Sequence, residues 1–186
     1  MKLIVRFIED KLGLIVNVEK SKISRPKELK FLGFGYYYDV KNKRYQVKPR
    51  PSSIQKFQRK LRKLTRRNLG VPLDYQILKL KQVIFGWVNY FRIANMKKVT
   101  ERIDMKLRSR IRVIIWKQWK VSKKQIKSLM KLGIPEEEAK GLTYCRKGYW
   151  YIGLSKVVQR AISNKRLKQR GLPSALEHYL KVHTVI

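Results

Sequence analysis

LDYQILKLKQVIFGWVNYF, residues 73–91, is the stretch around which the rest of the chain is organised. Apolar side chains recur in it at intervals of three and four, the spacing of one face of an α-helix. The stripe is wide enough for a helix buried among other helices, with Pro72 suited to its first turn and Asn95 placed to close it. We predict a central buried helix whose core residues are Leu73, Ile77, Leu80, Ile84, Trp87, Val88 and Phe91.

A further helix is predicted on either side of this one. The first follows Pro49 and Pro51 and continues until Gly70 ends it, and the second covers about 98–119. Three antiparallel helices with short connections form a small bundle, which we assign to 51–130. The core residues expected from the two flanking helices are Ile54, Phe57, Leu61, Leu64, Ile103, Leu107, Ile111, Ile114 or Ile115, and Trp119.

The segments outside the bundle are shorter. Before it, a helix over 1–12 and two strands over 29–38 and 44–49 are predicted, and the strands read as a hairpin. After it, Ser122 is placed to cap the first of several short helices. The predicted fold class is therefore mainly α with a small β-hairpin, in three segments: 1–50, 51–130 and 131–186.

The chain is strongly basic. Forty-six Lys and Arg against twelve Asp and Glu give a formal net charge of +34 over 186 residues. Such a charge repels itself in a folded protein, and a polyanion that releases its counterions on binding is the expected partner. Hydrophobic residues make up 44% of the chain, so it can also bury a core. We expect a folded nucleic-acid-binding protein rather than a disordered basic tail.

The amino-acid sequence argues against several other classes of protein. Cys145, His178 and His183 are too few for a structural zinc site, and no metal or cofactor is predicted. No paired aspartates or glycine-rich phosphate loop occurs, so no catalytic residue is assigned. No apolar run reaches the ~18–20 residues of a membrane span, so no membrane contact is predicted and a cytoplasmic location is expected.

The candidate binding residues are cations on the polar sides of the two flanking helices. Tyr149, Trp150 and Tyr151 fall on no apolar stripe, which leaves them open to packing or to stacking on unpaired bases. We expect one phosphate-binding face from each helix. The first set is Lys56, Arg59, Lys60, Arg62, Lys63, Arg66 and Arg67, and the second is Arg102, Lys106, Arg108, Arg110 and Arg112.

A series of short blocks occurs in a particular order along nearly the whole chain. The blocks are Leu14-Ile15-Val16-Asn17-Val18-Glu19-Lys20-Ser21-Lys22, Phe31-Leu32-Gly33-Phe34, Leu64-Thr65-Arg66-Arg67-Asn68, Gly86-Trp87-Val88-Asn89-Tyr90-Phe91, Trp116-Lys117-Gln118-Trp119-Lys120 and Gly148-Tyr149-Trp150. Each is short, but their order and spacing make the match specific. The chain resembles the C-terminal half of a bacterial group II intron reverse transcriptase/maturase.

The resemblance implies a role for each segment, and residues 131–186 would be a C-terminal helical extension of the maturase domain. Residues 1–50 would be the end of the polymerase palm, with Lys20 near the phosphates of an incoming nucleotide. Phe31, Leu32, Gly33 and Phe34 would belong to the hairpin that grips the primer terminus. Residues 51–130 would be the thumb, or maturase-specific domain. In this family that domain binds intron RNA and helps splicing and mobility, so group II intron RNA is the expected partner, with target DNA or primer as a further one.

The sequence departs from that family in its catalytic motifs. The Tyr-Ala-Asp-Asp motif that supplies the metal-binding aspartates is absent, as are the cysteine pairs of the usual endonuclease. We therefore expect a truncated reverse transcriptase that is not catalytic on its own. Two alternatives stay open: the chain completes an RNA-directed DNA polymerase together with a separate upstream fingers-palm chain, or it is a general basic nucleic-acid-binding protein.

Overall fold

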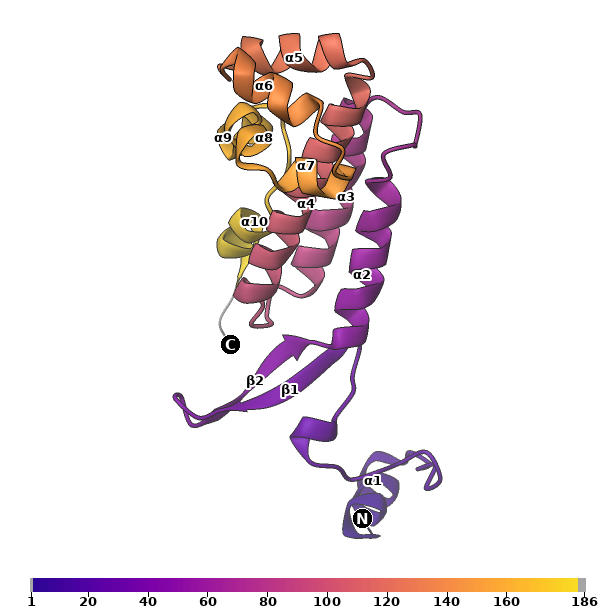
Figure 1. Cartoon of the computed structure of the whole chain (residues 1–186). Helices are drawn as coiled ribbons and strands as arrows, with labels where there is room; N and C mark the ends of the chain where they lie inside the picture. Colours follow the sequence, from indigo (N-terminus) through magenta and orange to yellow (C-terminus); the bar gives the residue numbers. More distant parts are fainter. Residues whose placement is uncertain (1, 184–186) are drawn as a thin grey trace.

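The computed structural model describes residues 2–183, and its main body is a helical bundle (Figure 1). An isolated helix, a one-turn 3-10 helix and a two-stranded hairpin precede the bundle. These first elements are α1 (Lys2–Leu12), η1 (Pro26–Glu28), β1 (Phe34–Asp39) and β2 (Arg44–Pro49), followed by the bundle helices α2 (Pro51–Leu64), α3 (Leu73–Tyr90) and α4 (Lys97–Gln118). The mainly helical fold with one small hairpin confirms the predicted fold class.

Shorter helices continue from the far end of α4 and return along the bundle (Figure 1). In chain order they are α5 (Ser122–Lys131), α6 (Glu136–Thr143), α7 (Tyr149–Leu154), α8 (Lys156–Ala161), α9 (Asn164–Gln169) and α10 (Ala175–Val182). The last of them packs against both α3 and α4, so the end of the described chain lies near the hairpin end of the bundle. No helix among residues 2–183 is long and apolar enough to cross a membrane.

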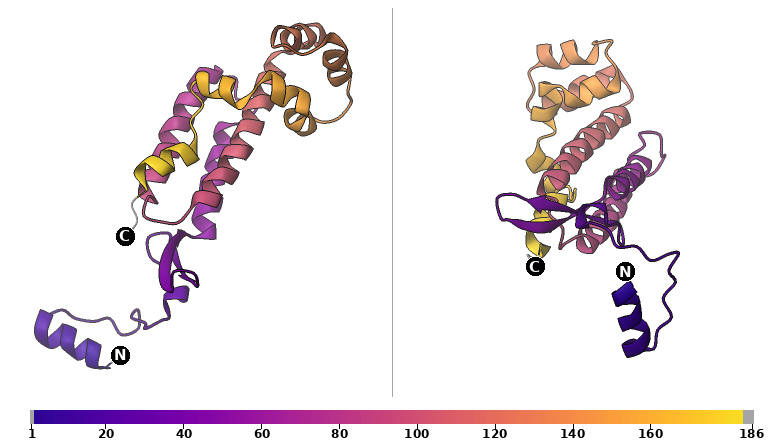
Figure 2. Two further views of the ribbon diagram at one scale, coloured as in Figure 1. Left: turned by 90° about the vertical axis from the view of Figure 1, so that its left-hand side faces the viewer. Right: turned by 90° about the horizontal axis from the view of Figure 1, so that it is seen from below.

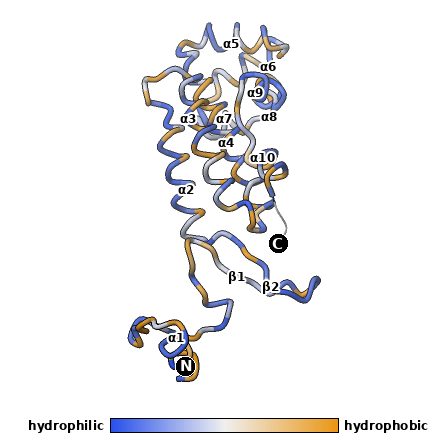
Figure 3. The backbone as a smooth tube through the Cα atoms, turned by 180° about the vertical axis from the view of Figure 1, so that it is seen from behind, coloured by the Kyte–Doolittle hydropathy of each residue, from blue (hydrophilic) through white to orange (hydrophobic). Residues whose placement is uncertain are grey.

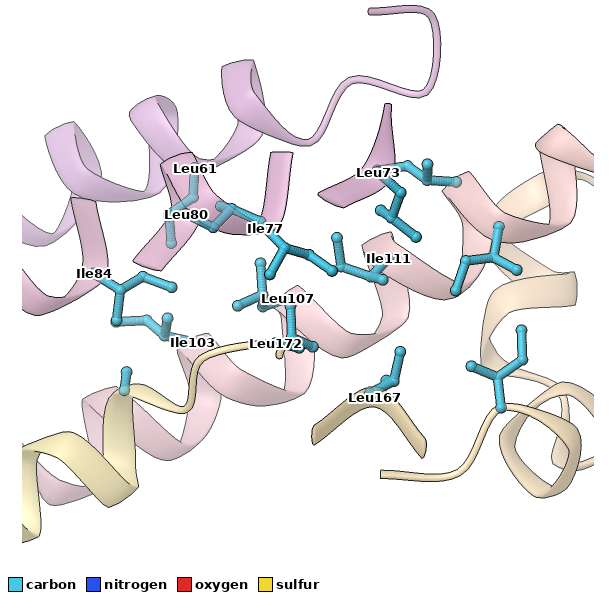
Figure 4. Packing of buried hydrophobic residues seen from close by; sticks show 14 of the residues in the cluster. Leu61, Leu73, Ile77, Leu80, Ile84, Ile103, Leu107, Ile111, Leu167 and Leu172 are labelled. Carbon is cyan, nitrogen blue, oxygen red and sulfur yellow. The ribbon is translucent and has the colours of Figure 1, made fainter. Parts of the chain in front are cut away.

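The hydrophobic core lies where α3 meets its neighbours. Leu80, Ile84 and Val88 of α3 are fully buried, as the apolar stripe of residues 73–91 predicts. Figure 4 shows Ile77 of α3 facing Leu107 of α4. Each buried aliphatic side chain of this kind contributes about 1.5–3 kcal/mol to stability. In α4 the buried tryptophan is Trp116; the predicted Trp119 is only half-buried against it.

The hairpin is antiparallel and shorter than the sequence predicts. Its register pairs Phe34 with Pro49 and Asp39 with Arg44. The first strand begins at Phe34 rather than 29 because Leu32 and Gly33 both have positive φ, 48° and 82°, and form a tight turn that ends in the Phe34 N–H to Phe31 carbonyl hydrogen bond of 2.8 Å.

Three helix ends also differ from prediction. The helix before Gly70 ends at Leu64, so Arg66 and Arg67 lie in the loop and not on the cylinder. The central helix ends at Tyr90, and Asn95 instead donates its backbone N–H to Val47 of the hairpin at 2.8 Å. Ser122 is the first residue of α5, whose cap position is Val121, so its side chain caps nothing.

The N-terminal segment stands apart from the bundle. Helix α1 has no buried residue, and Figure 2 shows it remote from the other helices in two further views. Its apolar side chains Leu3, Phe7 and Leu12 are exposed, and the tube in Figure 3 shows hydrophobic positions along α1 with no element packed on them. A helix whose apolar face is uncovered has little tertiary stabilisation of its own.

Candidate nucleic-acid interface

Helix α2 carries apolar side chains on one side and cationic side chains on the opposite side. Phe57 and Leu61 are buried against the bundle, and the ring of Phe57 stacks on Trp87 of α3 with 4.4 Å between the ring centroids. The opposite side is exposed, and no Asp or Glu occurs between Asp39 and Asp74 to offset its charge. The exposed cations that share this side, here called the α2 basic face, are Lys56, Arg59, Lys60 and Lys63.

The C-terminal end of the α2 basic face opens into a groove of about 950 Å³. The loop after α2 forms one wall through Arg66 and Arg67, and Tyr149 and Trp150 of α7 form the other. The Arg67 guanidinium lies over the Tyr149 ring, 4.3 Å from its centroid. We call this hollow the basic groove. A guanidinium-lined groove with exposed aromatic rings is suited to phosphates and bases together.

The other end of the α2 basic face meets the turn before the hairpin. Lys56 and Lys60 line a hollow of about 670 Å³ together with Leu32 and Gly33. The turn is fixed there because Tyr90 donates its hydroxyl to the Leu32 carbonyl at 2.9 Å. The sequence predicts different functions for the turn and for the helix, and the structure brings them to one site.

The remaining residues named by the resemblance are placed differently. Phe34 is half-buried and lies edge-on to Phe91, 4.8 Å between centroids, so its ring serves packing. Phe31 is exposed beside the same turn. Lys20 lies in an exposed turn whose N–H bonds to the Asn17 side chain at 3.0 Å, in the segment between α1 and η1. The structure does not bring Lys20 into the hollow that holds Leu32 and Gly33.

The second predicted set does not share one face of α4. Arg102, Lys106 and Arg110 are spaced by four residues and lie on one side, whereas Arg108 and Arg112 lie on the opposite side. Lys106 and Arg110 line a pocket shared with α2, and Arg108 lines a different hollow of about 450 Å³ beside the C-terminal helices. The expectation of a single phosphate-binding face on this helix is therefore wrong.

Arg112 is buried rather than displayed. Its side chain is only 5% exposed, and Nε donates to the Ile162 carbonyl at 2.9 Å while Nη2 donates to the Asn164 Oδ1 at 2.9 Å. Burial lowers the pKa of Arg112, and the nearby Arg108 lowers it further. This guanidinium joins the α8–α9 turn to α4 and is not available to phosphates, which corrects its assignment to the binding face.

The Arg110 side chain is only partly available for contact with phosphates. Its Nη2 donates to the carbonyls of Arg62 at 3.2 Å and Thr65 at 3.1 Å, so it holds the end of α2. Burial is the main cause that lowers the pKa of Arg110, and the charge of Arg62 adds to it. All of these partners are neutral, so the positive charge stays uncompensated at the mouth of the basic groove.

Acidic residues do little to neutralise this surface. The ion pairs of residues 2–183 join Lys140 to Glu136, Arg160 to Glu138, Lys168 to Glu177 and Arg170 to Asp74, and none of them includes a residue of α2. No group of three His, Cys, Asp or Glu in that range is placed to hold a metal ion. The side chains gathered here therefore present positive charge that is suited to binding anions.

A comparison with known families identifies the segment that carries the α2 basic face. Residues 54–133 match the family described as the group II intron, maturase-specific domain. This match confirms, for this part of the chain, the resemblance drawn from the sequence. The match runs from α2 to the turn at Gly133, so it includes most of the basic groove but neither the hairpin nor α7. No match to a curated protein was found.

Proposed function

We propose that the chain binds group II intron RNA through the α2 basic face and the basic groove, and so stabilises the folded intron during splicing and mobility. The observation that carries this proposal is the coincidence of the maturase-specific domain with an exposed cationic face free of carboxylates. Phosphate contacts of this kind supply most of the affinity for a structured RNA and position the protein on it. A maturase-specific domain does not by itself indicate an independent catalytic activity.

The test is filter binding to a group II intron transcript across a salt series, with bulk tRNA as competitor. Replacing the α2 basic face with glutamine (K56Q, R59Q, K60Q, K63Q) is expected to lower the affinity and to flatten the slope of log K against log salt by up to about 2.8–3.6, roughly 0.7–0.9 for each phosphate that is no longer neutralised. An unchanged slope overturns the assignment, and equal binding of tRNA favours a general nucleic-acid binder instead.

A matched control lies on α5. Lys123, Lys124, Lys127 and Lys131 are exposed, carry the same total charge and belong to the same matched segment, but they lie away from α2. Their replacement by glutamine removes an equal charge from the protein. We expect a much smaller change of slope for this variant, which separates a particular surface from net charge.

A second candidate function is assembly with a separately encoded fingers-palm chain into an RNA-directed DNA polymerase. The exposed apolar side chains of α1 favour it, because an uncovered apolar face marks a surface for a protein partner. Primer extension by the reconstituted mixture tests it, with target DNA or primer as the added substrate. Synthesis that requires both chains supports the assembly, and a mixture that makes no product excludes it.

A further inference from the structure

A small pocket lies between α2 and α4, on the bundle side of the α2 basic face. Its volume is about 150 Å³, and we call it the α2–α4 pocket. Three buried side chains, Leu61, Ile103 and Leu107, make its lining apolar. Cations stand around the same pocket: Arg62 and Lys106 are exposed, and Arg110 is half-buried.

Trp150 forms a wall shared by the α2–α4 pocket and the basic groove. Its side chain is 51% exposed, which is unusual for a tryptophan, the largest apolar residue type. The exposure is not a result of loose packing, because α7 is fixed against α4. Ile152 is buried, and Gly153 approaches α4 so closely that an added Cβ would lie 2.5 Å from Val113 Cγ2.

We propose that the α2–α4 pocket receives an unpaired RNA base, stacked on Trp150, while the phosphates beside that base lie against Arg62 and Lys106. This inference rests on the proposed RNA binding and adds to it the class of nucleotide that the surface selects.

The chemistry of the pocket fits a nucleobase better than any part of a duplex. A base has two apolar faces, polar edges and a phosphate on either side, and the pocket offers apolar walls, an amide and a cationic rim. In a duplex those faces are stacked on neighbouring pairs, so only a looped-out or single-stranded base can enter. Base stacking on an aromatic ring is worth about 1–3 kcal/mol and tolerates different sequences.

Gln58 supplies the polar group that a base edge needs. Its side chain lines the α2–α4 pocket, and its amide makes no hydrogen bond to the protein within residues 2–183. A free amide can donate and accept at once, as the Watson–Crick edge of an unpaired base requires. The cations of the rim likewise form no ion pair in the part of the chain described, so an incoming phosphate meets uncompensated charge.

The test begins with the unaltered protein and two probes of equal length: a short single-stranded oligoadenylate, and the same ribose-phosphate chain without bases. Fluorescence anisotropy of the labelled probes is expected to give about tenfold tighter binding for the oligoadenylate, the effect of one stacked base. Equal affinity for the two probes overturns the proposal. This arm needs no variant, so it cannot be confused with misfolding.

The second arm changes Trp150. Trp150→Leu is expected to lower the affinity for oligoadenylate about tenfold, to the value of the base-free chain, and to leave the affinity for a blunt-ended, fully paired RNA duplex unchanged. Trp150→Phe keeps an aromatic face and is expected to retain most of the affinity. Tyr75→Leu is the matched control, because Tyr75 is also an aromatic residue 51% exposed, but on α3 and outside this pocket.

The outcomes separate this inference from the proposed function. A protein that ignores the intron transcript even at low salt refutes both. A protein that binds the transcript, but whose Trp150→Leu variant loses affinity equally for oligoadenylate and for the base-free chain, refutes the base pocket and leaves the phosphate-binding face standing. Loss for oligoadenylate alone, with the Tyr75→Leu variant unchanged, supports the pocket.

Discussion

Arg110 of α4 holds the C-terminal end of α2 through Thr65. Its Nη2 donates to the Thr65 backbone carbonyl at 3.1 Å, and Thr65 in turn donates its own hydroxyl to the Leu61 carbonyl at 2.7 Å. The last carbonyls of a helix have no partner inside it, and here a guanidinium from another helix satisfies them. The loop that carries Arg66 and Arg67 is thereby fixed at the edge of the basic groove.

Arg110→Ala is therefore expected to destabilise the protein by about 1–3 kcal/mol, because it leaves partly buried carbonyls without a donor. The free energy of unfolding from urea titration measures it. Lys106→Ala, one turn earlier on the same side of α4, is the control, since Lys106 is exposed and should change stability by less than about 0.5 kcal/mol. Equal destabilisation of the two variants would show that Arg110 contributes as surface charge alone.

The sequence predicts the helical bundle well, but it does not predict which arginine side chains are buried and hydrogen-bonded inside the fold. The stripe from Leu73 to Phe91 is a local pattern, and local patterns define a buried helix without knowledge of its neighbours. The same sequence predicts Arg110 and Arg112 to be surface cations. Their partners are 45 and more residues away, at Thr65, Ile162 and Asn164, so nothing near them in the chain reveals that they are used inside the fold.

The candidate site shows the same limit. Charge density alone identifies the α2 basic face, because its cations are spaced along a single helix. From the sequence, Trp150 is recognised only as an aromatic residue that falls on no apolar stripe of a helix. The α2–α4 pocket that Trp150 lines also includes Gln58 of α2 and Lys106 of α4. These side chains come together only through the packing of three separate helices.

Arg112→Met should be strongly destabilising. The substitution removes the donors to Ile162 and Asn164 at a buried position, and each unsatisfied acceptor costs about 1–3 kcal/mol. Hydrogen exchange should show the largest decrease of protection in the α8–α9 turn, which Arg112 joins to α4. Asn164→Ala removes only one of the two hydrogen bonds and is expected to give a smaller effect. Retention of full protection in Arg112→Met would contradict this role.

Gly153→Ala tests the close approach of α7 to α4. The new Cβ would lie 2.5 Å from Val113 Cγ2 and 3.2 Å from the Ser109 carbonyl oxygen, and one of these groups is backbone. We expect a destabilisation of about 1–3 kcal/mol from overpacking, measured by urea unfolding. Gly141→Ala is the matched control: nothing lies within 4 Å of its Cβ, and in α6 the change should stabilise by roughly 0.5–1 kcal/mol.

His178 should make stability depend on pH. Its ring stacks on Phe85 with 4.0 Å between centroids, and its Nε2 lies 2.7 Å from Asn89 Oδ1. Burial lowers the pKa of His178, and the charge of Lys181 lowers it further. The unfolded chain, with a histidine pKa of about 6.5, therefore binds the proton more readily than the folded one.

The contribution of His178 to stability is thus present above about pH 6.5 and is lost as the pH falls towards the lower folded-state pKa. Urea midpoints measured at several pH values on either side of about 6.5 test it. His178→Gln has no proton to gain in this range, so its stability should vary less with pH than that of the unaltered protein. The same pH dependence in both proteins would rule out the ring as its source.

Gly33 lies in the turn before the hairpin and is hydrogen-bonded to α2. Its replacement tests two sources of strain, a steric clash and a left-handed backbone. Its φ is +82°, and an added Cβ would lie 2.8 Å from Ser53 Oγ, whose hydroxyl donates to the Gly33 carbonyl at 3.0 Å. Gly33→Ala therefore adds a steric clash to a left-handed backbone that itself costs about 1–2 kcal/mol for a residue with a Cβ. We expect urea unfolding to show a destabilisation larger than that backbone cost.

Ser53→Ala in the same protein removes the hydroxyl that the new methyl group meets but leaves the backbone strain in place. If the clash with Ser53 matters, the destabilisation by Gly33→Ala measured in the Ser53→Ala background should fall to about 1–2 kcal/mol. If the destabilisation is the same in both backgrounds, the left-handed backbone alone explains it. Because Gly33 lines the hollow that also holds Lys56 and Lys60, a shifted turn should also weaken intron RNA binding.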